Sequence, residues 1–152
     1  MNQTTARLTL AAVAVALIGA PLLAAPADQV RARITGFREL GAAFKNVNDG
    51  LRGDMQTVLI QQSAREIRNA SRAQYGWFPA GTGPQVGVKT AAKPEIWSRS
   101  AQFKAAQDAF AQQADIFQRT AAGGNAAAIR AEARKLGATC KGCHDTFRVP
   151  SD

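Results

Sequence analysis

The sequence predicts an all-α protein, an antiparallel four-helix bundle with one long crossover loop. Three observations indicate this class. Four segments repeat apolar residues at spacings of three and four, the period of an amphipathic helix, and no segment reads as a strand. Short turn signals join the first two segments and the last two, whereas a stretch rich in glycine and proline, Gly76 to Pro94, separates the pairs. Residues 28–152 suffice for one domain with a single core.

The first helix is expected to begin at Asp28, whose side chain can cap it, and to end at an Asn48-Asp49-Gly50 turn. Its apolar seam consists of Val30, Ile34, Phe37, Gly41, Phe44 and Val47. The second helix is expected from near Asp54 to about Tyr75, with a less regular pattern. Its apolar positions are Met55, Val58, Leu59, Ile60, Ala64 and Ile67.

The crossover loop carries Trp77 and Phe78, and Trp97 follows it. These rings either pack beneath the loop or contact a prosthetic group. The third helix is expected from Glu95 to Ala121, with a core stripe of three phenylalanines seven residues apart. They are Phe103, Phe110 and Phe117. Gly123-Gly124 then ends this helix, and Asn125 caps the fourth.

The fourth helix carries the most informative pattern. Its apolar seam follows a 4-3-4-3-4 spacing through Ile129, Ala133, Leu136, Cys140, Cys143 and Phe147. Both cysteines therefore lie on the face that is directed into the bundle. A group attached to them must be inserted into the bundle interior.

The segment Cys140-Lys141-Gly142-Cys143-His144 holds the only two cysteines and the only histidine of the chain. Cys-x-x-Cys-His is the attachment signature of c-type haem, in which both thiols add to vinyl groups and the imidazole binds iron. On a helix all three side chains project from one face. Zinc, a thioredoxin-like redox motif and a structural disulfide are the alternatives. Zinc lacks a fourth Cys or His, and the redox motif lacks its preceding strand.

Residues Met1 to Ala27 resemble a secretory signal. Arg7 supplies the positive region, Leu8 to Ala20 the apolar region, and small residues precede a cut at Asp28. An uncleaved anchor and a cut after Ala25 are the alternatives. Because c-type haem is attached outside the cytoplasm in bacteria, we expect a periplasmic protein, without a membrane span once the leader is removed.

The chain is basic, with 19 Lys and Arg against 11 Asp and Glu. These basic residues are scattered along the helices. They therefore indicate a solvated surface and not a nucleic-acid interface.

Taken together, these segments resemble the class II c-type cytochromes, specifically the cytochrome c′ family. The resemblance covers essentially all of residues 28–152. It is carried by the C-terminal motif through Arg148 and by the segments Leu40–Lys45, Phe78–Gly83 and Lys93–Ser98. It implies one covalently attached haem c at the C-terminal end of the bundle, and homodimers packed through the first two helices.

The resemblance also implies roles for individual residues. Cys140 and Cys143 are the expected thioether attachments, and His144 is the expected proximal iron ligand. Arg148, one helical turn beyond His144, is expected beside that ligand, where it can meet an anion. The family register places Arg33 near a haem propionate.

The same register places Phe37 over the sixth coordination position of the iron. Its alternative is a plain core residue. A low-spin electron carrier needs a second ligand, usually Met or His. The only histidine is already used, and Met55, the only methionine after the leader, falls beyond the first helix. We therefore expect a five-coordinate, high-spin haem with an aromatic ring over its open face.

An apolar lid without a hydrogen-bond donor disfavours an oxygen carrier and favours binding of nitric oxide, with carbon monoxide bound weakly. By family analogy nitric oxide can end on the proximal side in place of His144. Two further classes stay open: a periplasmic electron carrier that meets an acidic redox partner, and a protein that sequesters haem. No activated nucleophile or paired acid and base indicates an enzyme.

Overall fold

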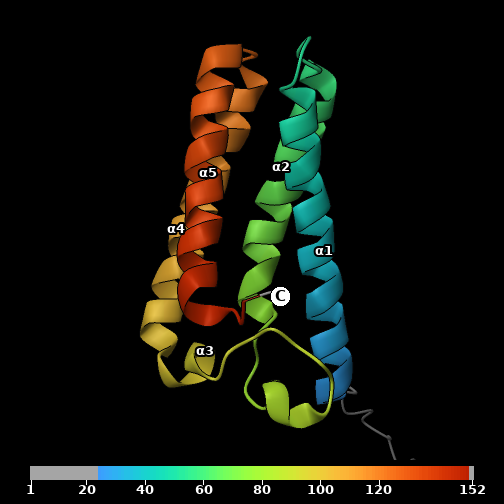
Figure 1. Cartoon of the computed structure of the whole chain (residues 1–152), viewed down its shortest axis with the longest axis vertical. Helices are drawn as coiled ribbons and strands as arrows, with labels where there is room; N and C mark the ends of the chain where they lie inside the picture. Colours follow the sequence, from blue (N-terminus) through green and yellow to red (C-terminus); the bar gives the residue numbers. More distant parts are fainter. Residues whose placement is uncertain (1–23, 151–152) are drawn as a thin grey trace, which may run out of the picture.

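The computed structural model describes residues 24–150 and consists of helices joined by turns (Figure 1). The helices are α1 (Pro26–Gly50), α2 (Thr57–Ala73), α3 (Glu95–Ser98), α4 (Ser100–Ala122) and α5 (Ala126–Phe147), with short 3-10 turns η1 (Gln74–Gly76) and η2 (Pro84–Val86). Most of the expected leader, residues 1–23, lies outside the described residues. No helix within the described part is both long and apolar enough to cross a bilayer.

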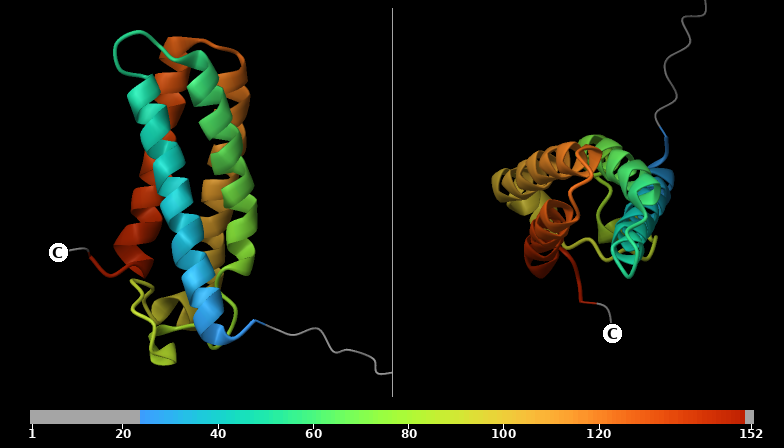
Figure 2. Two further views of the ribbon diagram at one scale, coloured as in Figure 1. Left: turned by 90° about the vertical axis from the view of Figure 1, so that its right-hand side faces the viewer. Right: turned by 90° about the horizontal axis from the view of Figure 1, so that it is seen from above.

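The four long helices form an antiparallel bundle, which confirms the predicted fold class (Figures 1 and 2). Helix α1 packs against α2, α2 against α4, and α4 against α5. The main core lies between them and contains Val47, Ile60, Ile67, Phe110, Phe117, Ile129 and Leu136, each at most 6% exposed. Helices α1 and α5, the remaining pair of neighbours, do not pack closely along their length. Seen from above, the ribbons of these two helices stand apart, and the side of the bundle between them is called the opening below (Figure 2).

Both ends of α1 differ from the sequence prediction. The helix begins at Pro26, which suits the first helical position because it needs no backbone donor there. Asp28 therefore lies in the first turn, where it pairs with Arg31 at 2.8 Å, and does not cap the helix. The helix also continues through Asn48-Asp49-Gly50. The Asp49 carboxylate accepts hydrogen bonds from Lys45 and Arg52, so this side chain supports the last turn instead of breaking it.

Helix α2 starts at Thr57, three residues later than expected from Asp54. The chain reverses at Gly53, whose φ of +58° favours glycine, and residues 54–56 complete the connection. Gly50 lets α2 approach closely, because a methyl group there would lie 2.9 Å from Cγ1 of Ile60. Met55 lies in this connection and packs against the main core.

The expected third helix is divided. A single turn, α3, precedes α4, and Arg99 between them has a non-helical backbone with φ −118° and ψ 46°. The Trp97 indole N–H donates to the carbonyl oxygens of Phe78 and Pro79, at 3.3 and 3.2 Å. These bonds fix α3 to the crossover loop, which explains why it does not continue straight into α4.

The turn between α4 and α5 agrees with the prediction. Gly124 has a φ of +72°, as a residue beyond a helix end often does. Asn125 caps α5, because its side-chain oxygen accepts the backbone N–H of Ala128 at 2.9 Å. Helix α5 then directs its predicted seam inward, with Ile129, Leu136 and Phe147 buried.

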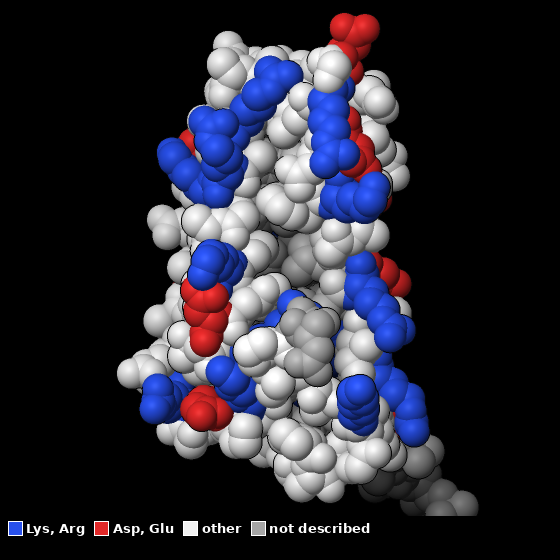
Figure 3. Space-filling view, in the orientation of Figure 1, with Lys and Arg blue, Asp and Glu red and all other residues white. Residues whose placement is uncertain are grey.

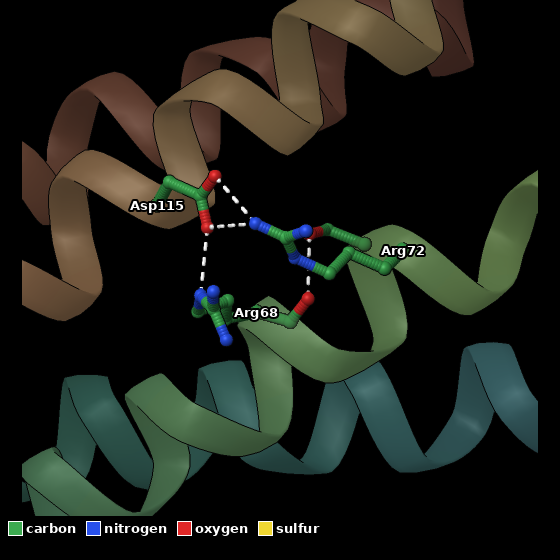
Figure 4. Close-up of polar contacts among 4 residues, drawn as sticks. Arg68, Arg72 and Asp115 are labelled. Atoms are coloured by element: carbon green, nitrogen blue, oxygen red, sulfur yellow. Dashed lines mark hydrogen bonds and ion pairs between the residues drawn. The ribbon is translucent and has the colours of Figure 1, made fainter.

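An ion cluster links α2 to α4 on the outside of the bundle (Figure 4). Arg68 Nε lies 2.8 Å from the Asp115 carboxylate, and Arg72 donates to both of its oxygens at 3.1 and 2.9 Å. Partial burial alone would raise the pKa of Asp115. Hydrogen bonds from Arg72 and Arg68 outweigh that effect, so the pKa lies below its ordinary value.

Candidate haem site

The last turns of α5 carry Cys140, Cys143 and His144 on one helical face. Cys140 packs against the main core, and Cys143 packs against a second cluster formed by Ile96, Phe103 and Phe147. Both thiols are free and half-buried. The prediction that the cysteines face the bundle interior is confirmed.

Burial raises the pKa of both thiols, that of Cys143 to about 11, with a further contribution from Cys140. Both are therefore neutral at pH 7, unlike the thiolates of reactive Cys-x-x-Cys redox sites. Within residues 24–150 no three His, Cys, Asp or Glu side chains converge to hold a metal ion. Two neutral thiols that pack against the core, with an exposed imidazole beside them, fit the covalent attachment of haem better than they fit zinc.

A chain of aromatic rings lies at the same end of the bundle and joins four of its segments. Phe37 of α1 contacts Phe78 of the crossover loop, with ring centroids 5.9 Å apart. Phe78 meets Phe103 of α4 edge to face at 4.8 Å, and Phe103 meets Phe147 of α5 at 5.1 Å. Apolar rings of this kind can pack against a planar macrocycle and exclude water from it.

Phe37 and the cysteines lie at the same level of the bundle, on opposite sides of its opening. From Gly50 down to Phe37 and from Ala126 down to Cys140, the helical rise gives about 20 Å in each case. Figures 1 and 2 show the first half of α1 and the last turns of α5 at the same end of the bundle. Met55 lies in the connection at the other end of α1.

Arg33, one helical turn before Phe37, is buried, with 2% of its surface exposed. Its Nη1 donates to the carbonyl oxygen of Trp77 and the hydroxyl of Thr82, both at 3.2 Å. Its Nη2 donates to the carbonyl oxygen of Thr82 at 3.0 Å and to the hydroxyl of Thr90 at 3.3 Å. All four acceptors are neutral, so this charge has no carboxylate partner among residues 24–150. Burial lowers its pKa accordingly.

The end of α5 is fastened to the crossover loop. Lys93 donates its backbone N–H to the Phe147 carbonyl at 3.0 Å, and Val149 donates to Ala91 at 2.8 Å. Because α5 ends at Phe147, Arg148 has an extended backbone and is not one helical turn further on the same face, as the sequence suggested. Its charge still acts on His144. Partial burial lowers the pKa of that imidazole first, and Arg148 lowers it further, while Asp145 opposes both.

Two features of this region were missed from the sequence. The Trp77 indole lies against Gly36 so closely that a methyl group there would be 2.6 Å from Cζ2 of the ring. The threonines that bind Arg33 were also missed. For the Trp77 contact, the glycine one residue before Phe37 was the available signal. Nothing in the local sequence marks Thr82 or Thr90 as hydrogen-bond partners of Arg33, which lies about fifty positions away.

Comparison with known proteins identifies the fold and the family. A family model described as Cytochrome C′ matches residues 28–148. The cytochrome c′ of Allochromatium vinosum is 28% identical over 151 residues, covering 98% of this chain and 97% of that protein. The crystal structure of cytochrome c′ from Thermochromatium tepidum matches with a TM-score of 0.79 at 25% identity. It covers 83% of this chain and 98% of that one.

A further solved structure is a nitric oxide complex of a variant of cytochrome c prime from Alcaligenes xylosoxidans. It matches with a TM-score of 0.76 at 27% identity and covers 85% of this chain and 99% of that one. The match extends over the whole bundle, and proteins of this kind hold haem c covalently through a motif like residues 140–144. The chain therefore belongs to the cytochrome c′ family.

Proposed function

We propose that this chain is a periplasmic haem protein whose single haem c is five-coordinate and high-spin. Its function is to bind small diatomic gases, nitric oxide above all and carbon monoxide weakly. Cys140 and Cys143 would form the two thioether links, and His144 would bind the iron. The haem, once attached, would supply an iron that can bind a gas molecule.

The position of Phe37 is the observation that carries this proposal. Its half-buried ring lies near the level of the cysteines and contacts the rings of Trp77 and Phe78, and a phenyl ring cannot coordinate iron. The only methionine of the described chain, Met55, lies about 20 Å from that level, at the other end of α1. Neither side chain supplies a sixth ligand.

Phe37 also limits which molecules enter. Its ring lies edge-on to Trp77 at 4.8 Å and also contacts Phe78, so moving it disrupts an apolar contact on each side. The ring excludes water and leaves no hydrogen-bond donor of its own over the open position. Small neutral gases are therefore favoured over anions. The nitric oxide complex of the Alcaligenes xylosoxidans relative supports nitric oxide as the ligand.

Arg33 would hold a haem propionate. A buried guanidinium whose acceptors are all neutral lacks the negative charge that normally accompanies burial. A propionate at this end of the bundle would supply it. Phe78, which lies 4.7 Å below the Arg33 guanidinium carbon, would border the same edge of the macrocycle. Arg148 would provide positive charge beside His144.

Electron transfer is the second candidate function. Exposed basic side chains border both sides of the opening between α1 and α5, and they would attract an acidic redox partner (Figure 3). Coordination of the sixth position by a protein side chain would favour this alternative over gas binding.

We also propose a homodimer packed through α1 and α2, where Val58 exposes 76% of its surface.

A pair of variants on α1 tests the role of Phe37. Phe37→Ala removes the ring at the cysteine level, and Phe44→Ala is the matched control two turns further along the same helix. We expect Phe37→Ala to raise the carbon monoxide affinity of the ferrous protein at least about tenfold, equivalent to roughly 1.4 kcal/mol. The control should change it less than about twofold. If both variants changed the carbon monoxide affinity equally, Phe37 would not be part of the gas-binding site.

A further inference from the structure

A groove of about 310 Å³ lies between α1 and α5, toward the end of the bundle that carries the α1–α2 turn. Its apolar wall consists of Phe44, Leu51, Ala133 and Gly137, and both Phe44 and Leu51 also pack against the main core. The volume lies in the range of pockets that hold small organic ligands, roughly 300–1,000 Å³.

The groove and the proposed haem site have different lining residues. Gly137 is its lining residue nearest the cysteines on α5, one helical turn before Cys140, and Phe44 is the corresponding residue on α1. These two residues meet at the lower end of the groove, since a methyl group on Gly137 would lie 3.3 Å from Cζ of Phe44. None of the residues proposed to hold haem lines the groove.

The polar part of the lining is cationic. Arg52 extends from the α1 side, and Arg130 and Arg134 extend from α5, with Asn48 as the remaining polar residue and no carboxylate. Arg130 donates one bond to the Leu51 carbonyl at 3.0 Å, which fixes its guanidinium at the groove. Arg52 shares Asp49 with Lys45, and Arg134 pairs with no carboxylate in the described chain. Figure 3 shows basic side chains along both margins of this part of the opening.

A second, smaller pocket has a different lining. It holds about 140 Å³ on the α2–α4 side and is lined by Gln61, Arg65, Gln118 and Ala122. It contains one arginine and almost no apolar wall. The α1–α5 groove differs in combining an apolar wall with three arginines from two helices.

We propose that the α1–α5 groove binds an organic anion with an apolar body, such as a medium-chain carboxylate. The apolar body lies against Phe44, Leu51 and Ala133. The anionic head is held by Arg134 and Arg52, because guanidinium groups bind carboxylates through paired, charge-assisted hydrogen bonds. An inorganic anion cannot use the apolar wall, and a neutral chain leaves the arginines without a partner.

Isothermal titration calorimetry of the haem-loaded protein with octanoate tests this site. The test variant is Arg52→Gln with Arg134→Gln, and the control is Arg65→Gln with Arg119→Gln, which removes the same charge from the α2–α4 side. Arg130 is left intact because it also holds the Leu51 carbonyl. We expect one saturable octanoate site per chain, weakened at least about fivefold in the test variant and less than about twofold in the control.

Two further ligands distinguish the contribution of the apolar wall from that of the arginines. 1-Octanol and sulfate should each bind at least about tenfold more weakly than octanoate. Octanol lacks the anionic head, and sulfate lacks the apolar chain. Absence of saturable octanoate binding would overturn the proposal. So would equal weakening by the two double variants, since that reports net charge alone, or octanol or sulfate binding as tightly as octanoate.

Discussion

The buried guanidinium of Arg33 donates to both the hydroxyl and the carbonyl of Thr82, at 3.2 and 3.0 Å, across 49 residues of sequence. This pair holds the crossover loop onto α1 immediately below the proposed gas-binding position. The loop in turn carries Trp77 and Phe78, the rings that contact Phe37. Arg33 therefore holds in place the loop whose rings border the proposed haem site.

Replacement of Arg33 by glutamine should destabilise the haem-loaded protein. The shorter side chain leaves the loop carbonyls and threonine hydroxyls without their donors, at a cost of about 2–4 kcal/mol in the free energy of unfolding. Arg31→Gln is the control, because Arg31 is exposed and pairs only with Asp28, so its loss should cost less than about 0.5 kcal/mol. Urea unfolding measures both values. Equal effects would mean that the loop does not depend on Arg33.

Two glycines of α1 should respond in opposite directions to alanine. At Gly36 the added methyl would lie 2.6 Å from Trp77, so Gly36→Ala should cost about 1–3 kcal/mol by displacing the indole. At Gly41 no atom lies within 4 Å, so Gly41→Ala should stabilise the helix by roughly 0.5–1 kcal/mol. Thermal unfolding measures the sign, and near-ultraviolet circular dichroism reports the tryptophan. A stabilising Gly36→Ala would show that Trp77 does not pack there.

The Asp115 cluster should make a small contribution to stability that depends on pH. Because the pKa of Asp115 is lower when the protein is folded, the contribution is present above the ordinary value of 3.8. It is lost as the pH falls through the folded pKa below that value. Asp115→Asn should therefore destabilise by about 0.5–1 kcal/mol at pH 7, and the difference from wild type should shrink below roughly pH 4.

Urea unfolding at several pH values checks this dependence. Asp54→Asn removes an exposed carboxylate that forms no ion pair within the described residues, and it serves as the control. A difference between Asp115→Asn and wild type that stays constant down to pH 3 would contradict an electrostatic origin.

As the cap of α5, Asn125 should contribute about 1 kcal/mol to the free energy of unfolding. Asn125→Ala should therefore lower that free energy by the same amount. The loss follows from the unpaired N–H of Ala128, which no other side chain accepts in the structure. Asn69→Ala in the exposed middle of α2 is the control. That change should be neutral or slightly stabilising, because alanine is the better helix former. A neutral Asn125→Ala would exclude the cap.

The sequence predicted the parts of the fold that depend on local patterns. The seam of α5 was read correctly because core positions must be apolar at helical spacing, and the cysteines follow that spacing. The end of α1 was read incorrectly, since Asn48-Asp49-Gly50 is typical of a turn. The structure keeps it helical because Asp49 pairs with Lys45 and Arg52, and because Gly50 admits Ile60.

For the candidate site, too, local motifs could be predicted from the sequence, whereas contacts between distant residues could not. Cys140, Cys143 and His144 are adjacent in sequence, so the attachment motif could be recognised without a structure. The partners of Arg33 and the tryptophan against Gly36 come from a loop far along the chain, and only folding brings them together. The break between α3 and α4 has a similar origin, because Trp97 is bound to loop carbonyls that the local sequence does not reveal.

The optical spectrum of the reduced, haem-loaded protein, recorded before and after addition of nitric oxide, tests the proposed five-coordinate site most directly. We expect a broad high-spin Soret band that changes on addition of the gas, because neither Phe37 nor Met55 can occupy the sixth position. Sharp, split low-spin bands that do not respond to nitric oxide would reveal a sixth protein ligand. That result would contradict gas binding beneath Phe37 and would favour electron transfer.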